Sequence, residues 1–219
     1  MSGRAVRTPT AGRASKPGAA KAKAAAAPTG TGEIRIIGGR FKRTRLAVAQ
    51  HPGLRPTPDR VRETPFNWLG QDLAGWRCID VFAGTGALGL EAASRGAQAV
   101  LLVESDAQLV QQLQRHVQRL GAGDVVQLRR GDGLQALAQQ ASASLDLVLI
   151  DPPFGEGAWF EPALKAARRA LAPTGFVYLE APHAWDDAAL APLGLALHRH
   201  LKAGAVHAHL LRLADAAPA

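Results

Sequence analysis

The sequence predicts an α/β protein with a doubly wound, mostly parallel sheet. From residue 77 onward, apolar runs of strand length alternate with longer segments of helical character, and such alternation gives parallel strands joined by right-handed crossovers. The run 145–150 is apolar without strict alternation, as expected of a strand buried on both faces. Residues 197–202 and 205–213, around Ala203-Gly204, predict a closing antiparallel hairpin at the sheet edge. Strands are predicted at 77–82, 99–104, 125–130, 145–150 and 175–180, and helices at 87–95, 106–120, 133–140 and 158–171.

Basic residues dominate the part of the chain that precedes this sheet. Of the net charge of +8, residues 1–32 carry +6 and residues 33–70 carry +5, whereas residues 71–219 carry −3. Residues 1–32 have almost no large apolar side chains, so we expect a disordered basic arm, followed by an N-terminal extension at 33–70 and the main domain at 71–219. The charge indicates binding to a polyanion. The alternative for the arm is a solvated tail that keeps the protein soluble.

The extension is predicted to contain a hairpin and helical turns. Ile34–Ile37, a turn at Gly38-Gly39 and a basic return to Val48 are typical of a short β-hairpin. Thr57-Pro58 and Thr64-Pro65 each place a capping Thr before a Pro at a first helical position. These signals predict two short helices with a break near Thr64, because a proline inside a helix costs about 3 kcal/mol. The alternative is one helix that is kinked at Pro65.

The loop from Asp80 to Gly89 joins the first predicted strand to the first helix. Gly84, Gly86 and Gly89 form a G-x-G-x-x-G pattern, whose glycines allow a ligand to approach the backbone and would suit a dinucleotide. Asp80 changes this interpretation, because a carboxylate at the strand end repels a pyrophosphate and suits a cationic ligand such as a sulfonium. The loop therefore favours S-adenosylmethionine over NAD, with Asp80, Phe82, Gly84 and Gly86 as cofactor-binding residues.

Two further acids follow the next two predicted strands. Glu104 is positioned to accept hydrogen bonds from both ribose hydroxyls, a role that NAD enzymes share. Asp132, with Gly133 beside it, is positioned to accept a hydrogen bond from an adenine amino group. The alternative for each acid is a helix N-cap or a first-turn residue. Three acids at three successive strand ends nevertheless indicate a cofactor site.

Asp151-Pro152-Pro153-Phe154 follows the most apolar strand without an intervening turn. Open α/β sheets keep their ligand crevice at the carboxyl ends of such strands. Two prolines fix φ and remove N–H donors, which leaves rigid carbonyls beside a carboxylate and an aromatic ring. Such a group can accept two hydrogen bonds from a planar amino group and stack against its ring. The alternative is a Pro-rich strand exit with a solvated Asp.

The C-terminal hairpin carries four histidines. With a two-residue turn at Ala203-Gly204, His200 would face His207 and His198 would face His209, all on one side. We favour a polar, solvated strand face over a zinc site, with a weak RNA or phosphate contact as a third option. No metal site is therefore predicted.

Together these motifs resemble the RsmD-type 16S rRNA guanine-N2 methyltransferases, a class I S-adenosylmethionine-dependent family with a Rossmann-like sheet. The resemblance covers about residues 33–213. It depends on the loop Asp80–Ala92 and on the Asp-Pro-Pro-Phe group. The most specific part is the set of N-terminal blocks that accompany them: Arg35-Ile36-Ile37-Gly38-Gly39, Gly53-Leu54-Arg55-Pro56-Thr57, Asp59–Thr64 and Phe66–Leu69. Pro65 departs from the family pattern, which usually carries an apolar helix former there.

The resemblance implies methyl transfer from S-adenosylmethionine to the exocyclic N2 of a guanine in 16S rRNA. We expect a cytoplasmic monomer that acts on a small-subunit particle, with naked RNA as the alternative substrate. The guanine would be flipped into the crevice and stacked on Phe154, while the Asp151 carboxylate and the Pro152 carbonyl hold its amino group. Basic residues would contact the RNA: Arg35, Arg40, Lys42, Arg43, Arg45, Arg55, Arg60 and Arg62. The alternative interpretation is that these residues form a basic face that contacts solvent.

Three other functions stay open on the sequence alone. Adenine-N6 DNA methyltransferases use a similar Pro-Pro-aromatic loop, typically with Tyr in place of Phe. An NAD-dependent oxidoreductase needs no Asp-Pro-Pro-Phe group and tolerates Asp80 poorly. An RNA-binding assembly module could use the fold without catalysis. No run of 18 apolar residues predicts a membrane span, and the single cysteine, Cys78, is predicted to be a buried filler, which fits a cytoplasmic protein.

Overall fold

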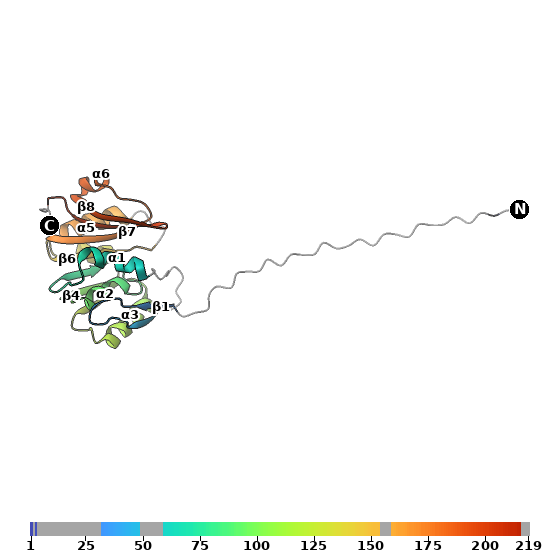
Figure 1. Cartoon of the computed structure of the whole chain (residues 1–219), viewed down its shortest axis with the longest axis horizontal. Helices are drawn as coiled ribbons and strands as arrows, with labels where there is room; N and C mark the ends of the chain where they lie inside the picture. The colour runs from blue at the N-terminus through green and yellow to red at the C-terminus, as the bar shows by residue number, and fades with distance from the viewer. Residues whose placement is uncertain (2, 4–31, 49–58, 154–158, 216–219) are drawn as a thin grey trace. The chain divides into compact units, whose positions relative to one another are not determined.

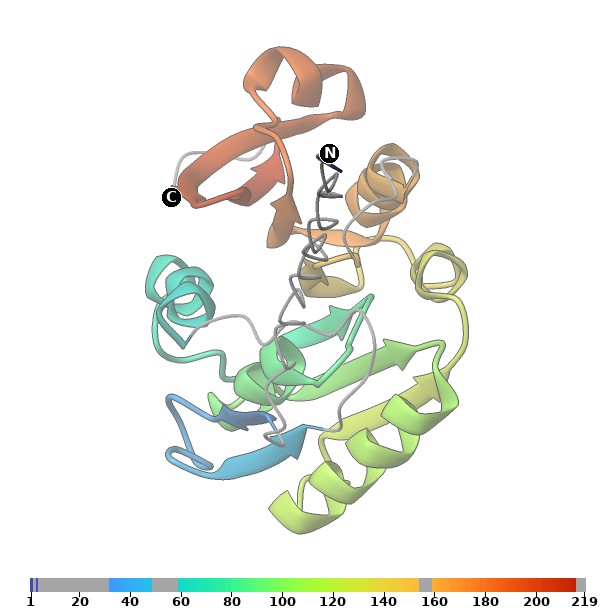
Figure 2. The same cartoon turned by 90° about the vertical axis from the view of Figure 1, so that its right-hand side faces the viewer.

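A computed structural model describes residues 1, 3, 32–48, 59–153 and 159–215 of the chain. The compact unit Thr31–Ala219 contains a two-stranded sheet, β1-β2, and a seven-stranded sheet of order β5-β4-β3-β6-β7-β9-β8 (Figure 1, Figure 2). Within these described residues, no helix has the length and apolar character needed to cross a membrane. The strands are β1 Gly32–Arg35, β2 Arg45–Val48, β3 Arg77–Asp80, β4 Ala99–Glu104, β5 Val126–Arg130, β6 Leu145–Ile150, β7 Leu171–Ala181, β8 Leu195–Ala203 and β9 Val206–Leu213. The helices are α1 Asp59–Leu69, α2 Ala87–Ser94, α3 Ala107–Leu120, α4 Gly133–Ala138, α5 Phe160–Ala170, α6 Asp187–Leu190 and the 3-10 helix η2 Ala191–Leu193.

The predicted fold class is confirmed. β5, β4, β3, β6 and β7 run parallel, and β9 and β8 continue the sheet in the antiparallel sense. The largest boundary difference is in β7, which begins at Leu171 and not near residue 175. Leu171 pairs with Leu145 on the far side of a register irregularity between β6 and β7, so the chain enters β7 directly from α5. An irregularity of this kind has no local sequence signal.

Two hydrophobic clusters cover the two faces of the sheet. Leu147 and Leu149 belong to the cluster that contains residues of α2, α3 and the N-terminal strands, whereas Val148 and Ile150 belong to the cluster with α4 and α5. Successive strand residues point to opposite faces. β6 is therefore buried on both faces, as its apolar sequence predicted, and the residue that follows it lies at the carboxyl edge of the sheet.

α1 is one helix with Pro65 in its interior, so the predicted break near Thr64 is wrong. Phe66 is fully buried, and Pro65 is buried next to it. Burial of a Phe side chain contributes about 1.5–3 kcal/mol, which offsets most of the roughly 3 kcal/mol that an interior proline costs. Tertiary packing thus overrides the local stop signal. The other predicted start, Thr57-Pro58, lies outside the described residues.

β1 and β2 form the predicted hairpin, but Gly38-Gly39 is not its turn. The strands pair from Gly32 with Val48 to Arg35 with Arg45, and residues 36–44 form a longer connection. Gly39 has a φ of +68°, and a Cβ on it would collide with the carbonyl oxygen of Ser94 at the end of α2. The glycines therefore allow the connection to contact α2 closely, a contact that spans more than 50 residues of sequence and has no local signal.

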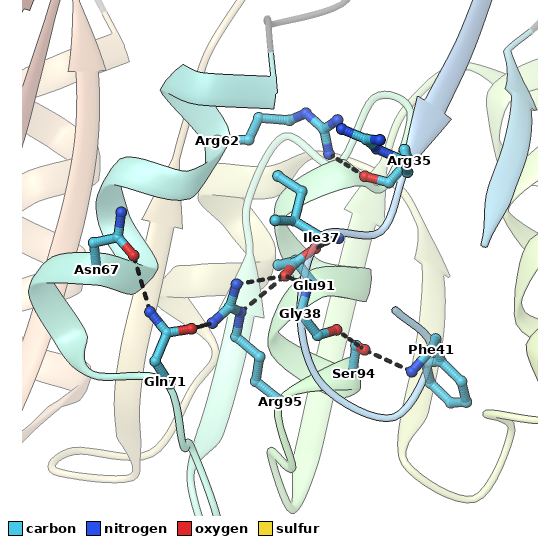
Figure 3. Close-up of polar contacts among 10 residues, drawn as sticks. All are labelled: Arg35, Ile37, Gly38, Phe41, Arg62, Asn67, Gln71, Glu91, Ser94 and Arg95. Atoms are coloured by element: carbon cyan, nitrogen blue, oxygen red, sulfur yellow. Dashed lines mark hydrogen bonds and ion pairs between the residues drawn. The ribbon is translucent and has the colours of Figure 1, made fainter. Parts of the chain in front are cut away.

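A buried ion pair holds this connection on α2 (Figure 3). The Glu91 carboxylate accepts the backbone N–H groups of Ile37 and Gly38, each at 2.7 Å. Glu91 also pairs with Arg95 at 2.8 Å, and the Arg95 guanidinium lies over the Phe66 ring, 4.8 Å from its centroid. All three side chains are buried. The extension thus shares one core with the main sheet.

The C-terminal hairpin has a different register from the predicted one. Its two-residue turn is Gly204-Ala205, so His200 lies opposite His209, and the pairing shifts around His198. Gly204 has a φ of +64° and takes the first central position of the turn, where type II′ hairpins favour glycine. The predicted turn was one residue too early. Because this moves the pairing by two residues, His200, His207 and His209 still share one face.

Candidate active site

Acidic side chains gather where the central strands end. Asp80 is the last residue of β3, Glu104 is the last residue of β4, and Asp151 follows β6 directly. Asp132 lies just after β5, and Glu180 is the penultimate residue of β7. Parallel strands end at the same edge of a sheet, where ligand crevices form. The fold therefore brings together every acid that the sequence singled out and adds one, Glu180, that it did not.

Asp80 is almost fully buried, with 2% of its surface exposed. Its Oδ2 accepts the backbone N–H of Gly89 at 3.0 Å. Burial raises the pKa of Asp80 to about 7; hydrogen bonds from the backbone of Gly89 and Phe82 oppose this rise, and the charge of Glu104 adds to it. Among the described residues, no Lys or Arg forms an ion pair with Asp80. A cation beside this carboxyl would favour its ionised form.

The glycines of the loop after β3 have separate physical roles. Gly84 and Gly86 have φ values of +52° and +80°, in the left-handed region that favours glycine, and Gly86 is the N-cap residue of α2. A Cβ on Gly89 would collide with the Leu102 side chain of β4, so Gly89 allows α2 to pack closely on the sheet. The G-x-G-x-x-G pattern thus combines a tight turn with a close helix contact.

Glu104 ties this loop to the end of β4. Its Oε2 accepts the backbone N–H of Gly84 at 2.8 Å, and its Oε1 accepts that of Asp106 at 2.8 Å. Oε1 also accepts the Ser105 hydroxyl at 3.4 Å, so Oε2 is the oxygen that can accept a second hydrogen bond, and Glu104 is partly exposed. The side chain therefore keeps acceptor capacity for the ribose hydroxyls. The ribose contact itself stays a prediction.

Asp132 is the N-cap of α4, because its Oδ1 accepts the backbone N–H of Gln135 at 2.8 Å. The alternative interpretation of Asp132 as a helix N-cap is thus confirmed, and the cap uses one of the two carboxylate oxygens. The contact with an adenine amino group stays a prediction. Gly133 has a separate reason to be glycine: a Cβ there would collide with the carbonyl oxygen of Val81. The loops after β3 and β5 therefore touch.

Asp151 precedes two prolines and has Glu180 and Asp80 as acidic neighbours. It is partly buried, Pro152 is buried and Pro153 is exposed. Burial, followed by the charges of Glu180 and Asp80, raises the pKa of Asp151 well above its ordinary range. Its carboxyl pairs with no Lys or Arg within residues 32–48, 59–153 and 159–215. Phe154, the predicted stacking partner, lies outside the described residues.

Glu180 is the acid that the sequence analysis missed. Only 6% of its surface is exposed, and its Oε1 accepts the Tyr178 hydroxyl at 2.7 Å. Burial raises the pKa of Glu180, and the hydrogen bond from Tyr178 opposes this rise. Like Glu104, Glu180 comes at the end of an apolar strand. The signal that identified Glu104 would therefore have identified Glu180 too.

Phe82 belongs to the loop after β3 and contacts the residue before α5. Its ring packs edge-to-face with Trp159, with 6.0 Å between the ring centroids. Phe82 is partly buried and packs against the cluster of α4 and α5. Its predicted contact with the cofactor stays a prediction.

Most of the predicted RNA-contact residues that the structure describes are exposed, but Arg62 is not. Only 2% of Arg62 is exposed, and its guanidinium donates to the Arg35 carbonyl oxygen at 3.0 Å (Figure 3). Arg62 therefore joins α1 to β1, which corrects its predicted contact with RNA. Arg55 and the side chain of Arg60 lie outside the described residues. The exposed members are Arg35, Arg40, Lys42, Arg43 and Arg45.

The basic connection between β1 and β2 lies at the far end of α2 from the acids. Residues 38–41 contact Ser94 at the C-terminal end of α2: the Ser94 Oγ accepts the backbone N–H of Phe41 at 2.9 Å. The loop with Gly84 and Gly86 lies at the N-terminal end of the same helix. A helix of eight residues is about 12 Å long. A polyanion that contacts both regions must span at least this length.

His200, His207 and His209 form a cluster in which the possible ligand atoms lie within 4.8 Å of one another. His200 Nε2 and His207 Nδ1 are 2.9 Å apart. His209 is buried, so the expected solvated face is only partly solvated. The Nε2 of His209 accepts the backbone N–H of Trp185 at 3.0 Å, and a metal ion would have to displace that bond. The cluster therefore lacks three free lone pairs.

Residues 34–212 match the family described as "Conserved hypothetical protein 95". The chain belongs to this family. It is 40% identical over 179 residues to "Ribosomal RNA small subunit methyltransferase D" of Escherichia coli (strain K12), which covers 81% of this chain and 89% of that protein. The Haemophilus influenzae protein of the same name is 41% identical over 129 residues, which covers 58% of this chain and 67% of that protein.

Solved structures agree with this family and with the fold. The structure of yhhF from Escherichia coli, named as a methyltransferase, has a TM-score of 0.71 at 38% identity and covers 83% of this chain and 98% of that chain. A Haemophilus influenzae structure named as a methylase has a TM-score of 0.68 at 28% identity and covers 84% of this chain and all of that chain. The resemblance found in the sequence is thus confirmed: the chain is a methyltransferase, and the oxidoreductase reading is wrong.

Proposed function

We propose that the chain transfers the methyl group of S-adenosylmethionine to the exocyclic N2 of a guanine in 16S rRNA of the small ribosomal subunit. The observation that carries this proposal is Asp151, a carboxyl without an ion-pair partner among the described residues, held beside Pro152-Pro153 and next to the buried Asp80. The relatives named as small-subunit rRNA methyltransferases support the substrate.

The described residues fit S-adenosylmethionine. Asp80 is a buried carboxyl, and a sulfonium or ammonium group would stabilise its ionised form. Gly84 and Gly86 bring a backbone without side chains to the strand ends, and Glu104 keeps acceptor capacity for a ribose. These residues, with Asp132, would hold the cofactor. When bound, the cofactor supplies a methyl group on a positively charged sulfur, so the protein need not activate the leaving group.

Positioning of the amino group is the main task left to the protein. The N2 lone pair of guanine is delocalised into the ring, which makes it a poor nucleophile. Hydrogen bonds from its two N–H groups to the Asp151 carboxylate and the Pro152 carbonyl would fix its direction toward the methyl group. A cation and an N–H donor nearby both favour ionised Asp151. After transfer, Asp151 can accept the surplus proton, because burial makes it a better base than an ordinary carboxylate.

The RNA would contact the exposed basic residues of the extension: Arg35, Arg40, Lys42, Arg43 and Arg45. Such residues neutralise phosphates and position the RNA without reading its sequence. The target guanine would leave its stack to reach the carboxyl edge. Of the other candidates from the sequence, no observation favours DNA, and the identity to rRNA methyltransferases argues against an assembly factor without activity.

Asp151→Ala tests this function. We expect it to lower methyl transfer to unmodified small-subunit particles by about 10³-fold or more, because the amino group loses its positioning. Binding of S-adenosylmethionine should stay within about threefold, since Asp151 is assigned to the substrate. Transfer is measured with labelled cofactor, and the product is mapped in the digested RNA as N2-methylguanosine.

Glu161→Ala on α5 is the matched control, because its exposed carboxylate pairs with Lys165 on the same helix. It should leave the rate unchanged. A methylated adenine in place of N2-methylguanosine, or normal turnover by the Asp151→Ala variant, would contradict the proposal.

A further inference from the structure

We propose that Glu180 determines the choice of base: its carboxylate accepts the N1–H of the target guanine while Asp151 holds the neighbouring N2 amino group. This inference rests on the proposed function, because it assigns a role to Glu180 within that same site. No part of the methyl transfer described above uses Glu180.

The sheet places Glu180 next to Asp151. In the parallel register of β6 and β7, Leu149 pairs with Tyr178 and Ile150 pairs with Leu179, so the next position brings Asp151 beside Glu180. Adjacent strands lie about 4.8 Å apart. Leu149 and Tyr178 belong to the same hydrophobic cluster, and side chains two positions further along each strand share that face. The two carboxyls are therefore neighbours on one face of the carboxyl edge.

The hydroxyl of Tyr178 holds Glu180 in place. It donates to Glu180 Oε1 at 2.7 Å, and Tyr178 itself is fully buried. This contact uses one acceptor position of the carboxylate and leaves Oε2 for another donor. In the part of the chain that the structure describes, no Lys or Arg forms an ion pair with Glu180. A buried carboxylate beside a second acid and without a cation is costly for the fold, which is typical of a group that serves a ligand.

Guanine supplies the donors that two adjacent carboxyls require. Its N1–H and N2 amino group are neighbours on one edge of the ring and both donate. Adenine presents an unprotonated N1 at the corresponding position, so a carboxylate there would face a lone pair. A site built to accept a substrate N–H rejects analogues that lack it, because its own buried polar group is left unpaired. Asp151 and Glu180 together thus match guanine and reject adenine.

The test compares guanine with 2-aminopurine, which keeps the amino group at C2 but lacks the N1–H. Small-subunit particles are reconstituted with 16S rRNA that carries either base at the mapped methylation position. The full chain should methylate guanine about 10³-fold faster than 2-aminopurine. In Glu180→Gln, the amide can donate to the N1 of 2-aminopurine, so the ratio of the two rates should fall at least about tenfold. Part of the wild-type preference comes from the missing O6, but Glu180→Gln leaves that difference unchanged.

The outcomes separate this inference from the proposed function. Failure of the wild-type chain to methylate guanine-containing particles would overturn the proposed function. Normal methylation of guanine, with a base ratio that Glu180→Gln lowers less than about tenfold, would overturn the role of Glu180 alone. A purely structural role would slow both substrates equally and leave the ratio unchanged.

Two further variants complete the experiment. Glu161→Gln on the exposed face of α5 should leave both rates unchanged. If circular dichroism shows that Glu180→Gln is not folded, Tyr178→Phe replaces it. Loss of the hydroxyl frees the Glu180 carboxylate to rotate, so the base ratio should fall at least about threefold. A smaller change in Tyr178→Phe would also overturn the inference.

Discussion

Asp80, which contacts α2, and Glu91, which belongs to α2, are both buried carboxylates, yet their partners differ. Glu91 accepts two backbone N–H groups and pairs with Arg95. Asp80 accepts Gly89 N–H and has no cation among the described residues, and its neighbours Glu104 and Asp151 are also acids. A buried carboxylate with a complete set of partners builds the fold, whereas one that lacks a cation is suited to receive one from a ligand. The set of partners, and not burial, distinguishes the two.

Removal of the Glu91 carboxylate should destabilise the fold. Glu91→Ala should lower the free energy of unfolding by about 3–5 kcal/mol, because it leaves the buried Arg95 guanidinium without a carboxylate partner and with Gln71 as a neutral acceptor. It also removes the acceptor for the Ile37 and Gly38 N–H groups. Unfolding in urea, followed by circular dichroism, measures the change.

The matched control for Glu91 is Glu33→Gln. Glu33 pairs with Arg45 at 3.4 Å on the exposed face of the hairpin. Removal of an exposed ion pair costs about 0–1 kcal/mol. Equal losses in the two variants would show that the Glu91 pair does not anchor the extension.

The buried Asp80 carboxyl should make the stability of the fold depend on pH. The pKa of Asp80 is about 7 in the folded chain and about 3.9 in the unfolded chain, so the folded state binds more protons between these values. The contribution of Asp80 to the free energy of unfolding is therefore fully present below pH 4 and is lost as the pH rises through 7. The loss is on the order of 4 kcal/mol from Asp80 alone.

Asp80→Asn isolates this effect, because Asn can still accept the Gly89 N–H but cannot ionise. The unfolding free energy of the wild-type chain should fall more steeply between pH 4 and pH 7 than that of the variant. If the proposed cofactor binds beside Asp80, a saturating amount should flatten the wild-type curve, because the sulfonium lowers the pKa of Asp80. Parallel curves for the two proteins would contradict the assignment.

Periodicity predicted the sheet well because its information is local. The run 145–150 has the composition of a strand buried on both faces, and that assignment placed Asp151 at the carboxyl edge. The same reasoning placed Asp80 and Glu104 at neighbouring strand ends. The same reasoning could have identified Glu180, since it also ends an apolar run.

Contacts between distant segments could not be predicted in this way. The Gly38-Gly39 pair looks like a turn locally, but its conformation is set by contact with Ser94 and Arg95 at the C-terminal end of α2. Pro65 looks like a helix stop, but burial of Phe66 keeps the helix intact. In the histidine hairpin, one residue of turn placement decided the register. Packing overrode the local signal in the first two cases, whereas the hairpin error came from the choice between two adjacent turns.

The smallest effects on stability should come from two glycines that make close contacts. Gly39 lies in the connection that packs on α2, and Gly133 lies among the proposed cofactor loops. A Cβ on Gly39 would collide with the Ser94 carbonyl, and one on Gly133 would collide with the Val81 carbonyl. Gly39→Ala and Gly133→Ala should each cost about 1–3 kcal/mol of stability. Gly123→Ala is the control, because nothing lies within 4 Å of its Cβ position, and its effect should stay within about 0.5 kcal/mol.

Cofactor binding should separate the two close contacts. Gly133→Ala pushes apart the loops after β3 and β5, which carry the residues proposed to hold S-adenosylmethionine, so the Kd for the cofactor should rise at least about tenfold. Gly39→Ala disturbs only the docking of the extension on α2 and should leave that Kd within about twofold. Titration calorimetry on both variants measures this difference. If Gly39→Ala weakened cofactor binding as much as Gly133→Ala, α2 would transmit strain between its ends, and the structural and functional halves would not be independent.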